Sequence, residues 1–444
     1  MTETVLLVGG GGREHAMAYA LRGGMELDAR DETDLELYAC AENRNPGIAR
    51  AADAFEVLDT TDPGAVVEYA TEVSADMVVI GPEAPLEAGV VDAVSEADIF
   101  GFGPTADLAR IETDKAFQRE FMQEHDIPGC PEFAVFDDPD AACEYIDDYD
   151  GDLAIKPTGL TGGKGVKVMG DQLNAEDAVE YVRESEYESF VLEERLVGEE
   201  FTIQAFVANG DLRVTPAVQD HKRAYEGDEG PNTGGMGSYS APGLALPFMS
   251  EGDYYEAVEI LQATVDALED YCGTLYGQFM LTADGVRVVE YNARFGDPEA
   301  MNTLPVMNTE FLDVLTAARD DTDLPQLSFA PRATVCKYAV PEGYPTDPTG
   351  GVKLEIEDLD TDDALLFYAS VDEREDGIYS TTSRSFAVVG IADTIAEAEA
   401  HAEDALDAVG VNEMHVRHDV GTADLIDRRI EHIEELREPL PEDA

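Results

Sequence analysis

The chain of 444 residues carries 96 aspartates and glutamates against 28 lysines and arginines, a formal net charge of −68. This surplus argues against a nucleic-acid-binding protein, because so few cations cannot form a basic face, and 44% hydrophobic residues argue against intrinsic disorder. Such self-repulsion favours a halophilic protein, because salt near 1 M shortens the Debye length to about 3 Å.

The length predicts about two to four domains. No window reaches membrane-spanning length and no signal peptide is evident, so we expect a cytoplasmic protein without a membrane partner. The cysteines form no C-x-x-C pair, which predicts reduced core residues; they are Cys40, Cys130, Cys143, Cys272 and Cys336.

Apolar runs at 5–8, 36–41, 77–80 and 99–102 alternate with helical patterns, which is typical of a parallel α/β sheet. The segment "VLLVGGGGREHAMA" predicts a strand, a glycine turn and a helix start whose free amides suit a phosphate. It is not the dinucleotide fingerprint, since the last glycine of that pattern is replaced by Glu14 or His15. A Rossmann dehydrogenase is therefore disfavoured. Glu83, after the third run, is a candidate acceptor for sugar hydroxyls.

The pattern along the chain predicts four segments. They are an N-terminal parallel α/β domain (1–103), a central domain (104–327) with a lid subdomain at about 126–192, a β-rich domain (328–425) and a final helix with an acidic tail (426–444). We expect an amphipathic helix over 106–125, strands at 333–340, 364–371 and 385–391, and a helix over 395–409.

Lysine is rare: the chain has seven, and Lys156, Lys164 and Lys167 lie together in "IKPTGLTGGKGVKV". The flanks "DLAIKPT" and "GVKVMGD" predict strands, so "GLTGGKG" is a loop between strands. A Walker A motif is excluded, because Thr158 and Gly165 occupy its glycine and hydroxyl positions. A glycine loop between strands can still fold over phosphates. The alternative, a flexible turn with solvated lysines, is disfavoured because lysine is otherwise so depleted.

Two further segments suggest nucleotide and substrate contacts. "FVLEERLVGEEF" predicts two strands joined by a short linker, where backbone near Glu193 and Leu196 could read adenine and Glu200 could accept ribose hydroxyls. Residues 219–242 are glycine-rich and lack periodicity, which favours a lid or substrate-binding loop that carries Asp220 and Lys222. His221, in the same stretch, is more typical of an ordinary polar loop residue than of a proton carrier.

A metal site is predicted in "GVRVVEYNARFGDPE". Alternation places Val288, Glu290 and Asn292 on one strand face, and a three-residue hairpin at 283–285 would set Gln278 opposite Glu290. Oxygen ligands of this kind suit magnesium with nucleotide phosphates; a polar solvent face is the alternative.

A glycine- and proline-containing turn follows the metal segment. Arg294 could grip a carboxylate or phosphate, and Asp297 could receive an ammonium group. Ordinary surface turn chemistry is the alternative here.

These motifs occur together in a known order: "GGGGREHA", "GPEAPLEAGVVD", "FGPTADLARIETDKAF", "GLTGGKGV", "QDHKR", "GPNTGGMGSYSAP" and "RFGDPE". Over nearly its whole length the chain resembles the ATP-grasp ligases, and within them the phosphoribosylamine-glycine ligase family. The resemblance implies an α/β and α+β multidomain fold: a parallel α/β domain, a central ATP-grasp domain with a glycine-rich lid, and a small C-terminal mixed β domain.

The resemblance also implies a reaction, in which ATP, glycine and 5-phosphoribosylamine give glycinamide ribonucleotide, ADP and phosphate. We expect small-molecule substrates, Mg²⁺ or Mn²⁺ as cofactor, and a monomer. Another ATP-grasp ligase that uses formate or bicarbonate, and a regulatory nucleotide-binding module, remain alternatives. One departure concerns Pro157 and Thr158, where the family often reads K-A-D-G, so any role of that lost carboxylate is in doubt.

Site residues carried over from the resemblance fall into three groups. The nucleotide group is Lys115, Lys156, Gly162, Gly163, Lys164, Gly165, Glu193, Leu196 and Glu200, and the metal group is Glu290 and Asn292 with Gln278 as a possible third. The substrate group is Gly11, Gly12, Arg13, Glu14, His15, Glu83, Asp220, Lys222, Arg294 and Asp297, of which Arg294 and Asp297 join Lys156 as catalytic residues.

Overall fold

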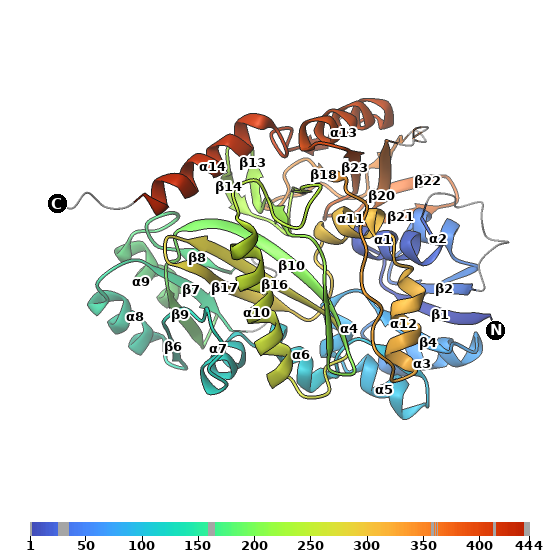
Figure 1. Ribbon diagram of the computed structural model, residues 1–444, viewed down its shortest axis with the longest axis horizontal. Helices are drawn as coiled ribbons and strands as arrows, with labels where there is room; N and C mark the ends of the chain where they lie inside the picture. The colour runs from blue at the N-terminus through green and yellow to red at the C-terminus, as the bar shows by residue number, and fades with distance from the viewer. Residues whose placement is uncertain are drawn as a thin grey trace.

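The computed structural model describes residues 2–24, 35–158, 165–356, 359, 361, 363–411 and 414–438. Figure 1 shows the N-terminal α/β unit and the small lid sheet on opposite sides of a long central sheet. No helix in these ranges is long and apolar enough to cross a membrane.

The N-terminal unit is a five-stranded parallel sheet in the order β3-β2-β1-β4-β5. Four strands match the predicted runs, and the edge strand β3 was missed because most of its side chains are exposed and form no apolar run. The strands are β1 (Glu3–Val8), β2 (Leu35–Ala41), β3 (Ala54–Val57), β4 (Met77–Ile80) and β5 (Phe100–Phe102); the helices are α1 (Gly12–Leu21), α2 (Pro46–Ala51), α3 (Pro63–Glu72), α4 (Glu83–Glu87) and α5 (Val90–Glu96).

The predicted helix over 106–125 is two helices, α6 (Ala106–Thr113) and α7 (Lys115–Glu124). Asp114 separates them because its backbone is extended and its side chain accepts a hydrogen bond from the Phe117 amide, which caps α7. This break places Lys115 in the first turn of α7.

The lid sheet has four antiparallel strands in the order β6-β9-β7-β8, with its own hydrophobic core beneath two helices. The strands are β6 (Phe133–Phe136), β7 (Leu153–Pro157), β8 (Lys167–Val168) and β9 (Phe190–Glu194), and the helices are α8 (Pro139–Asp148) and α9 (Ala175–Glu184). The antiparallel pairing of β7 with β8 confirms the two strands predicted on either side of the glycine-rich segment. Gly162, Gly163 and Lys164 lie outside the described residues.

The central sheet has ten strands and continues across residue 327, because β15 pairs with β18. Its path is β17 (Gly285–Asn292), β16 (Gly273–Thr282), β10 (Gly198–Ala208), β12 (Val218–Asp220), β15 (Gly237–Ser240), β18 (Ala333–Pro341), β23 (Phe386–Ala392) and β20 (Ala364–Tyr368), with β11 (Asp211–Val214) beside β10 and β24 (Met414–Val416) beside β18. The strands before residue 327 and those after it therefore share one backbone hydrogen-bond network.

Several helices and short strands complete the fold. They are α10 (Glu251–Ala267), α11 (Glu299–Thr303), a 3-10 turn (Leu304–Val306), α12 (Phe311–Arg319), α13 (Ile395–Val409), α14 (Ala423–Arg437), the pair β13 (Arg223–Tyr225) and β14 (Glu229–Asn232), and the strands β19 (Lys353–Leu354), β21 (Val371–Arg374) and β22 (Gly377–Ser380). Residues 219–242, interpreted as a loop, contain β13, β14, β15 and part of β12. Strands this short give no periodic signal in the sequence.

The β16–β17 hairpin confirms that Gln278 lies opposite Glu290, but by a different route from the predicted one. The turn pairs Thr282 with Gly285, and a β-bulge near Phe279 then shifts the register. The bulge also corrects the predicted face: Val288 is buried in the hydrophobic core, whereas Glu290 lines the cavity described below.

Packing of α13 on β23 predicts a sensitive glycine. A Cβ at Gly390 would lie 1.9 Å from the carbonyl oxygen of Ala398 on α13, so Gly390→Ala must push the helix off the sheet. We expect a loss of about 1–3 kcal/mol in the free energy of unfolding, seen as a lower urea midpoint in concentrated KCl. Gly243→Ala is the control, because a Cβ there has no atom within 4 Å. Equal midpoints for the two variants would contradict this packing.

Candidate active site

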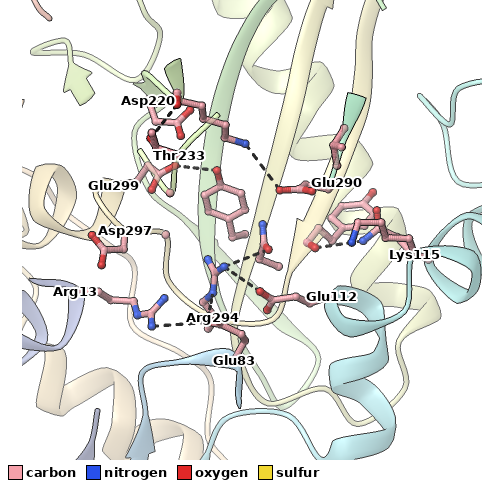
Figure 2. Close-up of a pocket in the computed structure, with 18 of the residues that line it drawn as sticks. Arg13, Glu83, Glu112, Lys115, Asp220, Thr233, Glu290, Arg294, Asp297 and Glu299 are labelled. Carbon is pink, nitrogen blue, oxygen red and sulfur yellow. Dashed lines mark hydrogen bonds and ion pairs between the residues drawn. The ribbon is translucent and has the colours of Figure 1, made fainter. Parts of the chain in front are cut away.

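A cavity of about 300 Å³ lies where the N-terminal unit, the lid and the central sheet meet. Figure 2 shows charged side chains from segments far apart in the sequence pointing into it. A second cavity of about 150 Å³ adjoins it and shares Lys156, Glu193, Lys222 and Glu290 with it. Leu196, Glu200 and Gln278 line only the second. This pair of joined cavities combines most of the residues predicted for nucleotide and metal.

Three of the seven lysines, Lys115, Lys156 and Lys222, line the larger cavity. Lys156 is nearly buried, its Nζ lies 2.7 Å from Glu193 Oε2, and it donates to the Val289 carbonyl at 2.9 Å. Burial lowers the pKa of Lys156, and Glu193 opposes that shift. Three of the few lysines in the chain therefore lie together at a cavity, where they could bind an anion.

Glu193 is the common partner of two buried cations. Arg119 donates to it from Nε at 2.7 Å and from Nη2 at 2.9 Å, and Lys156 binds the same carboxylate. Burial opposes ionisation, but Arg119 and Lys156 outweigh it and lower the pKa of Glu193. The Glu193 side chain thus holds Lys156 in place. That backbone groups near Glu193 and Leu196 hydrogen-bond to adenine stays a prediction.

The predicted metal ligands lie together, and some of their oxygens already accept hydrogen bonds from protein groups. Gln278 Oε1 accepts from Lys222 Nζ at 2.5 Å, while its Nε2 donates to Glu200 at 2.5 Å. Glu290 is partly exposed, 3.9 Å from Lys222, and Asn292 Oδ1 accepts from Arg294 at 3.3 Å. The donor set fits a hard cation at Glu290 and Asn292, whereas Gln278 would first have to release Lys222.

The residues that the structure describes contain no group of three or more His, Cys, Asp or Glu side chains suited to a metal ion. An ion at Glu290 and Asn292 therefore needs further oxygens from a ligand, and nucleotide phosphates would supply them.

Glu112 is a site residue that the sequence analysis missed. Its Oε1 lies 2.9 Å from Arg294 Nη2, and its Oε2 accepts from the Ala293 amide at 2.7 Å. Burial raises the pKa of Glu112 to about 7, although Arg294 opposes the shift. Arg294 Nε also lies 3.5 Å from Glu83, which is 4.0 Å from Arg13, so carboxylates and guanidinium groups alternate along this wall (Figure 2).

Asp297 is held by two C-terminal residues that were also missed. Tyr338 donates to Asp297 Oδ1 at 2.5 Å, and Arg384 Nη2 lies 3.1 Å from Oδ2. Arg384 also donates to the carbonyls of Gly234 and Gly235 and lines the cavity. The C-terminal region therefore builds part of the site. No motif around these two residues signalled it.

Two further carboxyl side chains, Asp220 and Glu299, line the cavity on the same side as Asp297 (Figure 2). Glu299 Oε1 accepts a hydrogen bond from Tyr276 at 2.8 Å. Burial raises the pKa of Asp220, Lys222 opposes this shift, and Glu299 adds to it. The pair favours a positively charged partner.

Several residues of the glycine turn after β1 make contacts within the fold. The Gly11 amide donates to Glu14 at 2.7 Å, which caps α1, and His15 Nδ1 accepts from the Tyr368 amide at 2.9 Å. Burial, with Arg50 nearby, lowers the pKa of His15 to about 3. Of the predicted residues here, Arg13 lines the large cavity and Gly11 lines a separate one of about 220 Å³. Substrate contacts by Gly12, Glu14 and His15 stay predictions.

His221 lines neither of the two joined cavities, and its interpretation as a loop residue that carries no proton stays a prediction. It is buried beside Tyr239, and neither ring nitrogen has a hydrogen-bond partner among the described residues. Burial and nearby Arg417 lower its pKa to about 3, so the ring is neutral.

Comparison with known proteins agrees with this architecture. Three family models match in succession: the N domain of phosphoribosylglycinamide synthetase over residues 3–112, its ATP-grasp (A) domain over 113–300 and its C domain over 334–423. The crystal structure of phosphoribosylamine-glycine ligase from Thermotoga maritima has a TM-score of 0.77 at 24% identity, covering 94% of this chain and 99% of that one. The chain is therefore an ATP-grasp ligase.

Curated relatives narrow the class. The phosphoribosylamine-glycine ligase of Methanococcoides burtonii is 50% identical over 440 residues, 98% of this chain and 99% of the relative. That of Methanocella arvoryzae is 49% identical over 441 residues, with the same coverage. The chain belongs to the phosphoribosylamine-glycine ligase family, whose members form a carbon-nitrogen bond. The biotin carboxylase domain of Hydrogenobacter thermophilus 2-oxoglutarate carboxylase, with a TM-score of 0.73 at 14% identity over 99% of this chain and 100% of that one, shares the fold.

Glu112 predicts a specific pH dependence. Its pKa is about 7 in the folded chain against an ordinary 4.5, so between these pH values the folded chain keeps a proton that the unfolded chain releases. Stability contributed by the protonated carboxyl is then lost as pH rises, by at most about 1.4 kcal/mol per pH unit. Glu112→Gln should flatten the wild-type slope of unfolding free energy between pH 5 and 7 in concentrated KCl. Parallel curves for wild type and variant would refute the assignment.

Proposed function

We propose that this chain joins glycine to 5-phosphoribosylamine at the expense of ATP, producing glycinamide ribonucleotide, ADP and phosphate in purine biosynthesis. One observation carries the proposal: the rare lysines converge with Glu290 and Asn292 on a cavity that also receives Arg294 and Asp297. Family membership at about 50% identity over the full chain supports the same reaction.

The nucleotide occupies the two joined cavities in this proposal. The base lies in the smaller one near Leu196, Glu200 accepts ribose hydroxyls, and the phosphates extend toward Lys115 and Lys156. A bound Mg²⁺ or Mn²⁺ would be held by Glu290 and Asn292 and would neutralise phosphate charge. Val166, next to Gly165, lines both cavities, so this part of the lid lies beside the phosphates in this proposal.

Glycine lies along the wall formed by Arg294 and Asp297. Arg294 orients its carboxylate, and the acidic groups Asp297, Asp220 and Glu299 attract its ammonium group. Formate and bicarbonate carry no ammonium group, so this acidic side favours glycine over both. Phosphoribosylamine approaches from the N-terminal unit, near Arg13 and Glu83.

The reaction then has two bond changes. A carboxylate oxygen of glycine attacks the γ-phosphorus, ADP leaves, and Lys156 offsets the charge that develops on the transferred phosphoryl group. The amine of phosphoribosylamine next attacks the carbonyl carbon of glycyl phosphate, phosphate leaves and the nitrogen loses a proton. Closure over the site protects the acyl phosphate from water.

The experiment that tests this function is ADP release in concentrated KCl with magnesium, ATP, glycine and freshly generated phosphoribosylamine, with each component omitted in turn. Release that requires both glycine and phosphoribosylamine supports the ligase. Release that continues without glycine, or with formate or bicarbonate in its place, contradicts it and favours another ATP-grasp ligase.

Lys156→Ala should lower turnover by at least about 100-fold, because phosphoryl charge goes uncompensated. Glu193 keeps Arg119 as a partner, so the variant should fold. Lys353→Ala, which removes a lysine on β19 outside the cavity, is the matched control and should keep wild-type turnover. Both are measured by steady-state ADP release; near-normal turnover in Lys156→Ala would remove this residue from the catalytic site.

Glu290→Ala should raise the magnesium concentration needed for half-maximal turnover by about tenfold or more, because one oxygen ligand is lost. The measurement is a magnesium titration at fixed ATP. Glu259→Ala removes the same charge from an exposed position on α10 and serves as the control. If the two variants share the wild-type titration curve, Glu290 is not a metal ligand.

A further inference from the structure

Helix α14 covers the face of the central sheet that lies behind the cavities (Figure 1). In β10, neighbouring side chains point to opposite faces: Glu200 lines the smaller cavity, and Glu199 is buried toward α14. There Arg429 Nε lies 3.2 Å from Glu199 Oε2, and His432 Nδ1 lies 2.6 Å from Glu199 Oε1. The helix is thus bound to the residue adjacent to a proposed nucleotide contact.

Side chains also alternate between the two faces along β12 and the two residues that follow it, His221 and Lys222. Asp220 and Lys222 face the cavity, and Gln219 faces the α14 side. Gln219 Nε2 donates to the Glu200 carbonyl at 2.9 Å and lies 3.4 Å from Glu199 Oε2. The side-chain amide of Gln219 therefore links β12 to β10 on the face of the sheet opposite the cavity.

Arg429 also binds a second carboxylate, Asp228, in the turn between β13 and β14. Arg417, which is fully buried, holds the other oxygen of Asp228 at 2.9 Å and Asp419 at 2.7 Å. Arg429 thus bridges Glu199 on β10 and Asp228 on the segment that follows Lys222. Without Arg429, the buried Glu199 keeps only His432 and Gln219 among the described residues, and the partly exposed Asp228 keeps only Arg417, so β10 and the β13–β14 turn lose their shared partner.

We propose that Arg429 is a positioning residue, which sets the distance between Glu200 on β10 and Lys222 after β12 by bridging Glu199 and Asp228 from behind the sheet. The inference rests on the nucleotide-binding role proposed above for the joined cavities. Small displacements of groups that position a substrate are costly, about 100-fold for 1 Å in unfavourable cases. A helix remote from the substrates then controls the affinity for nucleotide.

The test compares two arginines of the same helix. Arg429→Met should weaken the Kd for ATP by about tenfold and lower kcat/KM for ATP to match. Arg437 is the matched control, because it binds Asp253 at 2.9 Å and the Thr282 carbonyl at 3.3 Å, away from β12. Arg437→Met should reduce thermal stability and leave both ATP parameters unchanged.

Two milder variants keep the test decisive if Arg429→Met does not fold. Arg429→Lys retains the charge and should recover most of the affinity for ATP, and His432→Ala, at a more exposed position, should weaken it by about threefold. A wild-type Kd for ATP in His432→Ala would overturn the proposal, as would equal effects of Arg429→Met and Arg437→Met on that Kd. Because the Kd for ATP does not depend on the acceptor substrates, failure of the glycine reaction would leave this result interpretable.

Discussion

The buried ion pairs of Glu193 are the constraint on which the site depends. One carboxylate on β9 holds Arg119 from α7 and Lys156 from β7, so the lid sheet and the helix that precedes it cannot move independently of each other. Burying three charged groups is costly unless each is paired. The chain has a large excess of carboxylates that could pair with a lysine. The ion pair with Glu193 instead fixes the Lys156 side chain at the cavity.

The same logic extends around the cavity. Three further cations there have a protein carboxylate or amide oxygen beside them: Arg294 with Glu112, Arg384 with Asp297, and Lys222 with Gln278. Such pairs fix geometry before substrate arrives, which is the arrangement that phosphoryl transfer uses most. The central sheet supplies Gln278 and Glu290 on the cavity side, and its strands β10 and β16 contact α14.

Much of this site could be predicted from the sequence because it lies in local patterns. The two strands that flank the glycine-rich segment after Lys156 follow from alternation and turn residues. The pairing of Gln278 with Glu290 was predicted from a three-residue turn, whereas the structure reaches it through a two-residue turn and a bulge. Glu112 and Arg384 at the cavity, and Tyr338 at Asp297, could not be found from local patterns, because each reaches its place through tertiary packing from a distant segment. The bulge that turns Val288 into the core was equally invisible, since nothing in "GVRVVEYN" marks an extra residue. Halophily stays a prediction from charge alone.

In the proposed reaction, the cations around the cavity stabilise the phosphoryl group as it passes from ATP to the carboxylate of glycine. The most direct measurement uses glycine labelled with ¹⁸O in both carboxylate oxygens, with analysis of the phosphate released after ligation. Passage through glycyl phosphate requires one ¹⁸O in each phosphate and one in the amide of the product. Unlabelled phosphate would contradict the account, because glycine would then have been joined without phosphorylation of its carboxylate.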